Sequence, residues 1–225
     1  MDNVAILVPC YNEVLTIGNV IEDFGKYMPY ATIYVYDNNS TDGTYDKAKD
    51  YEATHKVVVR KSPKQGKGAV VRHMFKDIDA DIYVMIDGDS TYPVKDAVAL
   101  VKGIQNGMDM MLGDRLSSTY FKENTRRFHG FGNKLVRYLV NTLYHGCIPD
   151  VMTGFRAFNK KFVKNIDIVS DGFEIETELC IHALKNNYKI GSIPIRYVNR
   201  PDGSESKLDT LSDGVKVIEM IAKLK

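Results

Sequence analysis

Residues 83–93, YVMIDGDSTYP, are the stretch that decides the fold. The apolar run at 82–86 is typical of a parallel strand that is covered on both faces. It ends at Asp87-Gly88-Asp89, and carboxylates at the end of such a strand point into the crevice where open α/β sheets bind ligands. Like charges this close need a cation between them, and Mg²⁺ or Mn²⁺ suits oxygen ligands while leaving room for substrate phosphates. Asp-Gly is also common turn chemistry, so a purely structural role is the competing interpretation.

The chain around this stretch alternates predicted strands and helices. The expected strands are 4–8, 32–36, 56–59, 82–86 and 108–112. The expected helices are one that begins at Glu13, a short one behind Asp42, and 69–75 and 94–104. This alternation predicts an α/β fold with a mainly parallel sheet and helices on both faces. Because three strands end at Pro9, Asp37 and Asp87, one edge of the sheet should collect polar residues.

The pattern changes after residue 112. The second part is expected to contain a basic, aromatic helix at 126–144, the short segment DVMTGFRAF at 150–158, a helix at 174–185, a strand at 190–197 and a last helix from Leu208. No repeat, low-complexity segment or linker interrupts the chain. We therefore expect one domain over residues 1–225.

Composition narrows the possible classes of protein. An apolar fraction of 44% and a charged fraction of 26% are ordinary for a soluble globular chain, and a net charge of +1 gives no overall attraction to nucleic acid. Three cysteines at unrelated spacings predict neither a metal site nor a disulfide framework, which fits a reducing cytosol. We find no signal peptide and no apolar run of the roughly 18 residues that cross a bilayer. The expected location is cytoplasmic, with contact to a membrane surface left open.

Seven motifs carry a resemblance to a known family. They are VPCYNE (8–13), YDNNSTDGT (36–44), DGD (87–89), GDR (113–115), DVMTGFRAF (150–158), FEIETEL (173–179) and SESKL (204–208). The first three resemble the family 2 glycosyltransferases, which have the Rossmann-like GT-A fold. The later four are similar to the polyprenyl-phosphate sugar transferases, the group that includes dolichyl-phosphate mannose synthase. The motifs cover nearly the whole chain in the family's order.

The resemblance implies a donor site for a nucleotide diphosphate sugar in residues 1–114. Its nucleotide pocket would be built from Pro9, Tyr11, Glu13 and Asp37. Asp87 and Asp89 would be the metal-binding pair for Mn²⁺ or Mg²⁺, with Asp89 the more direct ligand. Gly66 and Lys67, in QGKG, resemble a phosphate cradle at a helix N-terminus, although the full P-loop spacing is absent. Turn and cap chemistry is the structural alternative for these residues.

The resemblance also implies an acceptor site in residues 115–225. The basic residues near its motifs are Arg115, Arg126, Arg127, Arg156, Arg200 and Lys207. Arg115 and one of the Arg126/Arg127 pair would hold the acceptor's phosphate, because a guanidinium grips phosphate oxygens bidentately. Arg200 and Lys207 would close over the donor or the acceptor. Solvated charge on a helix face is the alternative for Arg126 and Arg127.

The type of acceptor decides whether a general base is needed. A hydroxyl acceptor must lose its proton to a base, whereas a lipid phosphate is already anionic at neutral pH. Asp150, Glu174 and Glu176 lie in segments that could approach the site, so a base-dependent reaction stays open.

Two features depart from the family pattern. Thr91 stands where relatives often carry a glutamine near the metal, and the chain ends at residue 225 without the transmembrane helices of many bacterial relatives. Contact with lipid would then come from the helix at 126–144 and the terminal helix lying in the membrane interface, or from a membrane-embedded partner subunit.

These observations together predict an inverting, metal-dependent glycosyltransferase at the cytoplasmic face of the membrane. It would move a hexose or N-acetylhexosamine from a UDP-sugar such as UDP-glucose, or secondarily from GDP-mannose, to undecaprenyl or dolichyl phosphate. The alternatives are a soluble family 2 transferase acting on a polysaccharide hydroxyl, a sugar-1-phosphate nucleotidyltransferase and a non-catalytic nucleotide-sugar binding subunit. The last is disfavoured by the intact DGD motif.

Overall fold

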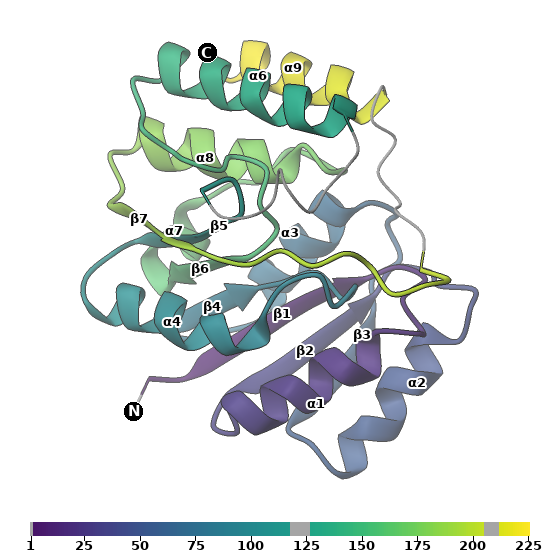
Figure 1. Ribbon diagram of the computed structural model, residues 1–225. Helices are drawn as coiled ribbons and strands as arrows, with labels where there is room; N and C mark the ends of the chain where they lie inside the picture. The colour runs from purple at the N-terminus through teal and green to yellow at the C-terminus, as the bar shows by residue number, and fades with distance from the viewer. Residues whose placement is uncertain (1, 118–126, 205–211) are drawn as a thin grey trace.

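The computed structural model describes residues 2–117, 127–204 and 212–225, and only the main chain of residues 127–131. A central sheet carries helices on both faces (Figure 1). The strands are β1 (Val4–Cys10), β2 (Thr32–Asp37), β3 (Val57–Lys61), β4 (Ile82–Met85), β5 (Met110–Asp114), β6 (Arg156–Asn159) and β7 (Ile190–Pro194). The α-helices are α1 (Ile17–Tyr27), α2 (Thr44–Asp50), α3 (Lys67–Asp77), α4 (Ala97–Gln105), α6 (Arg127–Leu143), α7 (Lys160–Asn165), α8 (Ile175–Lys185) and α9 (Ser212–Lys223). Two 3₁₀ turns are η1 (Tyr51–Ala53) and η2 (Val94–Asp96).

The sheet is mainly parallel, as the sequence predicts. Its strand order is β3-β2-β1-β4-β6-β5-β7, and only β6 runs antiparallel to its neighbours among the described strands. The chain builds β2 and β3 on one side of β1 and then crosses to β4 on the other side. Such a reversal leaves a crevice at the carboxyl ends of the two central strands, which is where ligands bind in sheets of this kind.

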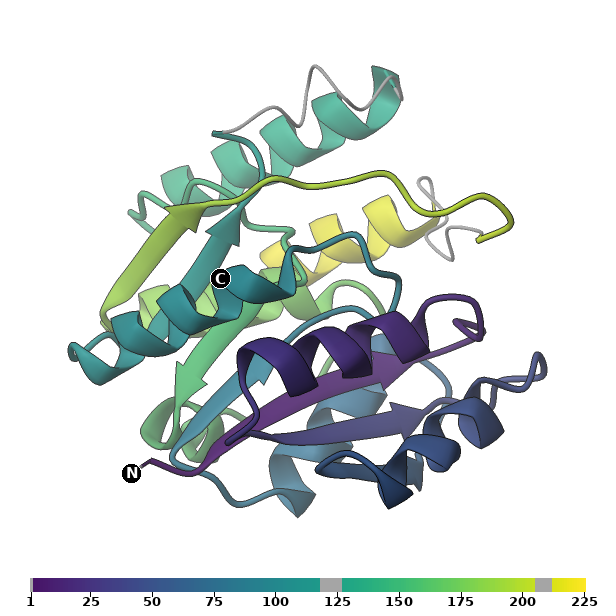
Figure 2. The same ribbon diagram turned by 60° about the horizontal axis from the view of Figure 1, so that its bottom comes forward.

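Each face of the sheet buries its own hydrophobic core. Along β1, Val4, Ile6 and Val8 pack toward α1, α2 and α4, whereas Ala5 and Leu7 pack toward α3 and α6–α9. Figure 2 shows α1 and α2 in front of the sheet and α9 behind it. Because both faces are covered, the central strands are continuously apolar, which explains the sequence pattern.

The predicted start of the first helix is wrong. α1 begins at Ile17 rather than at Glu13. Asn12 has a φ of 53°, in the left-handed region, so the backbone leaves β1 through a tight turn before the helix forms. The Glu13 carbonyl accepts hydrogen bonds from the main-chain N–H groups of Thr16 and Ile17. This turn directs the carboxylate of Glu13 away from the helix surface and toward the edge of the sheet.

Two short elements in the second half were not predicted. The segment DVMTGFRAF ends in β6, and α7 follows directly. β6 inserts between β4 and β5, so residues from both predicted halves of the chain share one sheet. The last helix is described from Ser212, and the predicted start at Leu208 lies outside the described residues. None of the helices in the described ranges combines the length and the apolar character that crossing a membrane requires.

Candidate active site

The carboxyl ends of β1, β2 and β4 meet at one edge of the sheet and line a pocket. The register places Cys10 beside Asp37, and the N–H of Ile86 donates to Leu7, which brings Asp87 next to the end of β1. The pocket has a volume of about 220 Å³. Its wall includes Pro9, Cys10, Tyr11, Glu13, Asn38, Gln65, Gly66, Lys67, Val70, Asp87, Gly88, Phe173 and Arg200. The structure thus brings together most of the residues predicted for the donor site.

Asp89 is the most deeply buried acid of the DGD motif, with 2% of its surface exposed. Its Oδ1 accepts hydrogen bonds from the N–H of Thr91 (3.1 Å) and from the Thr91 hydroxyl (2.6 Å). Its Oδ2 lies 2.6 Å from Nη2 of Arg200. Burial, and then the charge of Asp87, raise the pKa of Asp89 above its usual value. Thr91, noted in the sequence as a departure from the family, therefore orients the carboxylate of Asp89.

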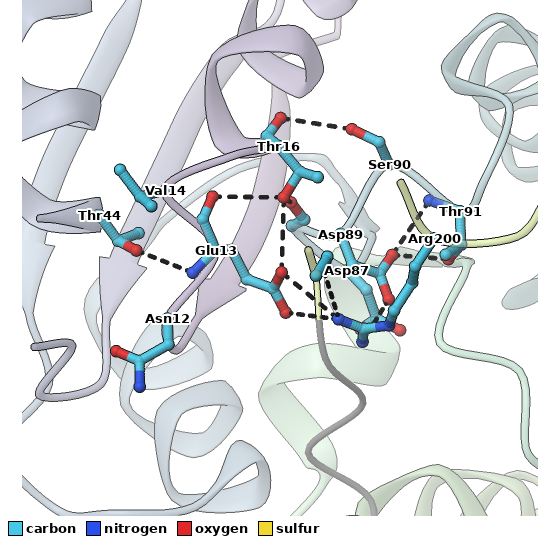
Figure 3. A network of polar contacts seen from close by, with 12 residues as sticks. Asn12, Glu13, Val14, Thr16, Thr44, Asp87, Asp89, Ser90, Thr91 and Arg200 are labelled. Atoms are coloured by element: carbon cyan, nitrogen blue, oxygen red, sulfur yellow. Dashed lines mark hydrogen bonds and ion pairs between the residues drawn. The ribbon is translucent and has the colours of Figure 1, made fainter. Parts of the chain in front are cut away.

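Arg200 joins two acids that are distant in sequence. Its guanidinium lies between the carboxylates of Glu13 and Asp89 (Figure 3), with Nη1 3.1 Å from Oε1 of Glu13. Thr16 donates its hydroxyl to the carbonyl of Gly88 at 2.7 Å and so ties the start of α1 to the DGD turn. These contacts hold the segment after β7 against the pocket wall, which includes Arg200.

Lys67 neutralises the other acid of the DGD motif. Its ammonium Nζ lies 2.5 Å from Oδ1 of Asp87 and 2.6 Å from Oε1 of Glu176. Burial alone would lower the pKa of Lys67, but the two carboxylates outweigh it and raise that pKa above the usual range. The two carboxylates thus hold the Lys67 ammonium in the wall of the pocket.

The described side chains in and beside the pocket carry more negative than positive charge. This excess bears on whether a divalent cation fits there. Among the described residues, the carboxylates of Glu13 and Asp87 and the cations of Lys67 and Arg200 line the pocket wall. The carboxylates of Asp89 and Glu176 lie directly beside it, paired with Arg200 and Lys67, and Asp37 adjoins it next to Cys10. The thiol of Cys10 is affected by this excess of negative charge. Burial raises its pKa, and the charges of Glu13, Asp37, Asp87 and Asp89 raise it further. An excess of buried negative charge favours binding of a cation.

The donor set suits a cation that is shared with a substrate. No cluster of three or more metal-ligating side chains occurs in the described ranges, so an all-protein cage is not built there. Two carboxylates plus phosphate oxygens are the usual ligands of Mg²⁺ at a nucleotide site. Asp87 and Asp89 fit such an ion, and they would hold it together with the donor diphosphate.

The predicted phosphate cradle at QGKG needs a correction. The N–H groups of Gly68 and Ala69 at the start of α3 donate to the carbonyls of Gly172 and Asp171, both at 3.1 Å. The N–H of Gly66 donates to Oδ1 of Asn38 at 2.7 Å. These donors are consumed by the protein and are not presented to an anion. In this segment the ammonium of Lys67, and not a backbone cradle, faces the pocket.

Among the described residues, one carboxylate oxygen of Asp37 has no hydrogen-bond partner. Oδ2 accepts a hydrogen bond from the N–H of Ser40 at 3.2 Å. Oδ1 is buried and has no hydrogen-bond partner in the part of the chain that the structure describes. An orphaned buried acceptor is costly unless a ligand or water satisfies it. Tyr11, which is 37% exposed, offers an aromatic surface in the pocket wall, and Asp37 adjoins that wall through its neighbours Cys10 and Asn38.

Arg115 and Asp150 form a buried ion pair behind this pocket. The guanidinium donates from Nε to Oδ2 (2.8 Å) and from Nη2 to Oδ1 (2.9 Å), and the main-chain N–H of Arg115 adds a third bond at 3.1 Å. Asp150 is fully buried and Arg115 is 7% exposed. Asp150, a candidate general base in the sequence, is therefore fully engaged in hydrogen bonds to Arg115.

The remaining predicted cations are placed differently or lie outside the described part. Arg156 is fully buried, and its guanidinium donates to the carbonyls of Val151 and Thr153, so it holds the turn before β6 and does not line the pocket. That corrects the expectation of a substrate contact. Arg126 and Lys207, and the side chain of Arg127, are outside the described residues.

Sequence reasoning named Glu176 only as a possible base and gave no role to Phe173. Glu176 instead pairs with Lys67, and Phe173 lies 5.9 Å from the same ammonium, measured to the ring centre. The signal that pointed to them was the motif FEIETEL, but nothing in the sequence placed the first turn of α8 against the start of α3.

Fold and pocket together are those of an α/β protein with a pocket of charged and polar side chains at the carboxyl edge of its sheet. The family model described as Glycosyl transferase family 2 matches residues 5–167, which is more than half of the chain. The chain belongs to glycosyltransferase family 2, and it is a glycosyltransferase with the GT-A fold.

Individual relatives support the same assignment. The chain is 37% identical to Glycosyltransferase AglJ of Haloferax volcanii over 95% of this chain and 69% of that protein. It is 28% identical to the Dolichyl-phosphate hexose transferase of the same organism, over 99% of this chain and 94% of that one. Its fold resembles that of glucosyl-3-phosphoglycerate synthase from Mycobacterium tuberculosis, solved with Mn²⁺ and UDP, with a TM-score of 0.77, 20% identity and coverage of 99% and 80%.

Proposed function

We propose that this enzyme transfers a hexose or N-acetylhexosamine from a nucleotide diphosphate sugar to a polyprenyl phosphate, inverting the anomeric carbon. The observation that carries the proposal is the state of the candidate bases. Asp150 is bound by Arg115 and Glu176 by Lys67, so neither is poised to take a proton from an acceptor hydroxyl. A phosphate monoester is already anionic and needs no base. The relative named as a dolichyl-phosphate hexose transferase supports the same class of acceptor.

Glu174 is the third carboxylate that a hydroxyl acceptor might use. Its Oε1 accepts hydrogen bonds from the N–H groups of Asp171 (3.2 Å) and Gly172 (2.9 Å), and it is absent from the pocket wall. Its position supports a role in shaping the loop before α8 rather than in proton transfer.

The donor side of the proposal rests on the pocket at the sheet edge. Tyr11 would stack on the base, and the orphaned Oδ1 of Asp37 would accept a hydrogen bond from the base or ribose. Lys67 and Arg200 would lie on either side of the diphosphate. A divalent ion, Mn²⁺ or Mg²⁺, held by Asp87 and Asp89 would act as a Lewis acid that stabilises the departing nucleoside diphosphate. A UDP-sugar such as UDP-glucose is the first candidate donor and GDP-mannose the second.

The acceptor side needs a cationic phosphate site and access to lipid. Arg115, together with Arg126 or Arg127 near the start of α6, is the proposed phosphate site, and Lys207 is proposed to close over it. Several apolar side chains on the outer helices are exposed: Leu135 and Tyr138 on α6, and Val215 and Ile218 on α9. They support peripheral contact with the cytoplasmic face of the membrane, directly or through a membrane-embedded partner subunit.

The test is transfer of radiolabelled sugar from a panel of UDP- and GDP-sugars to undecaprenyl and dolichyl phosphate, with Mn²⁺ or Mg²⁺ and with EDTA as the control. We expect a labelled lipid that forms only when metal is present. Label in a glycan acceptor without any lipid product would instead identify a polysaccharide transferase. Arg115→Lys, which keeps a cation opposite the buried Asp150 but loses the guanidinium fork, should raise the KM for the lipid phosphate much more than the KM for the donor.

A further inference from the structure

The side chain of Lys67, at the start of α3, is held by residues from two segments: Asp87 after β4, and Phe173 and Glu176 at the start of α8. The ammonium bonds to Asp87 on one side and to Glu176 on the other, and the ring of Phe173 lies 5.9 Å away. Only 10% of the Lys67 side chain and 7% of the Glu176 side chain are exposed. A lysine side chain normally samples many rotamers, so this amount of restraint indicates a defined position.

The backbone under Lys67 is fixed as well. A Cβ on Gly66 would lie 2.1 Å from the carbonyl oxygen of Asp171, and one on Gly68 would lie 2.5 Å from that of Ser170. Only glycine permits such close approach of two backbones. The hydrogen bonds from Gly68 and Ala69 to the same loop exploit this contact. The start of α3 and the loop before α8 therefore form one packed unit.

α8 itself anchors that loop. Glu178 accepts hydrogen bonds from the N–H groups of Val169 (2.8 Å) and Ser170 (3.0 Å) and from the hydroxyl of Ser170. Glu176, half a turn earlier, does not bond to the loop in the contacts that the structure describes; its carboxylate reaches past it to Lys67. Two buried acids on the same helix thus have separate tasks, one structural and one directed at the pocket.

The double pairing of Lys67 has a consequence for the metal-binding acid. With Asp87 as its sole counter-ion, Lys67 would compete with a divalent cation for that carboxylate. Glu176 supplies a second carboxylate 2.6 Å from the ammonium, so Lys67 stays in place when Asp87 turns to the cation. An ammonium group has three N–H donors, and the two carboxylates take two of them. Within the described ranges no further acceptor bonds to this ammonium, so its third N–H is available to an oxygen of a ligand in the pocket that Lys67 lines.

We propose that Glu176 is a positioning residue: it holds the Lys67 ammonium against the diphosphate of the nucleotide-sugar donor and leaves Asp87 available for the divalent cation. This inference rests on the donor pocket of the proposed function. It assigns Glu176 no proton transfer, which separates it from a general base. Its effect should therefore pass entirely through Lys67.

A double-mutant cycle tests this dependence. Binding of UDP and GDP is measured by calorimetry in MnCl₂ for the wild type, Glu176→Gln, Lys67→Met and the double variant. We expect Glu176→Gln to weaken binding of the preferred diphosphate about tenfold, and to add less than about twofold in the Lys67→Met background. Binding of the matching nucleoside, followed by ligand-observed NMR, should stay unchanged, because it lacks the diphosphate. Glu176→Asp should recover part of the loss.

Asp109→Asn is the matched control, since it removes a partly buried charge that bonds to Asn159 and Lys189 at the start of β5, the opposite edge of the sheet from Lys67. It should lower the stability of the protein and leave the affinity for the diphosphate within about twofold of the wild type once folded. An equal loss from Glu176→Gln with and without Lys67, or an equal loss for nucleoside and diphosphate, would overturn the positioning role. If the wild type bound neither UDP nor GDP, the donor pocket itself would be wrong, and this inference with it.

Discussion

The buried pair of Arg115 and Asp150 gives the sharpest prediction about the acceptor side. Asp150→Ala removes a fully buried carboxylate that accepts three N–H bonds from Arg115. Breaking a buried ion pair from one side strands the other charge, which typically costs about 3–5 kcal/mol. For a chain of this length a loss of 3 kcal/mol lowers the Tm by about 6–12 °C. Urea unfolding followed by circular dichroism measures the free energy of unfolding directly.

Two comparisons make this prediction specific. Asp79→Ala breaks an exposed pair with Lys160 and should change stability little, because solvent screens that pair. The double variant Arg115→Met/Asp150→Leu should be more stable than Asp150→Ala, since it leaves no unpaired charge. A loss below about 1 kcal/mol for Asp150→Ala would refute the reasoning. If Asp150→Asn folded as stably as the wild type and yet lost all transfer, a base role for Asp150 would replace the structural one.

Three further predictions concern the helix contact, the pH dependence and the metal. Gly68→Ala should cost roughly 1–3 kcal/mol of stability, because its Cβ would lie 2.5 Å from a main-chain oxygen. Gly214→Ala should not destabilise the protein, because no described atom lies within 4 Å of its Cβ position. Urea unfolding compares the two variants. Burial lowers the pKa of His182 in the folded protein below its usual 6.5. The unfolded chain therefore binds a proton at this histidine more readily than the folded protein does, and the free energy of unfolding falls as the pH drops from 7.5 to 5.5. His182→Phe should shrink that difference in urea unfolding, and an unchanged difference would exclude His182 as its source. Asp89→Asn should abolish transfer and the Mn²⁺-dependent part of UDP or GDP binding in calorimetry; metal-dependent binding that survived would argue against Asp89 as a ligand.

The fold could be predicted because its strands are buried on both faces. Continuous apolar runs at 4–8 and 82–86, each ended by polar residues, fix both the strands and the edge where the pocket forms. β6 escaped prediction because it has four residues and pairs antiparallel between distant strands, so its existence depends on tertiary contacts. The start of α1 escaped because helical periodicity continues through Leu15, although that side chain is 58% exposed and precedes the helix.

The candidate site also contains residues whose position the sequence could predict and residues whose contacts it could not. That Glu13, Asp87 and Asp89 lie close together could be predicted because they follow strands whose ends meet at one edge. The QGKG segment led to the prediction of a phosphate cradle because a glycine-rich helix start is compatible with two arrangements. It can bind an anion, or it can pack closely against a second backbone. Only the structure shows that the loop at 170–172 takes those N–H donors. The partners of Lys67 and Arg115 lie 109 and 35 residues away, so no local pattern could have paired them.

The central claim is that the acceptor is a phosphate that attacks without a protein base. The most direct measurement offers the enzyme undecaprenyl phosphate and undecaprenol side by side, with the preferred nucleotide sugar and Mn²⁺, and identifies the product by mass spectrometry. The account predicts a sugar linked to the lipid through a phosphodiester and no product from the alcohol. Transfer to undecaprenol, or to a glycan hydroxyl with the lipid phosphate inert, would contradict it.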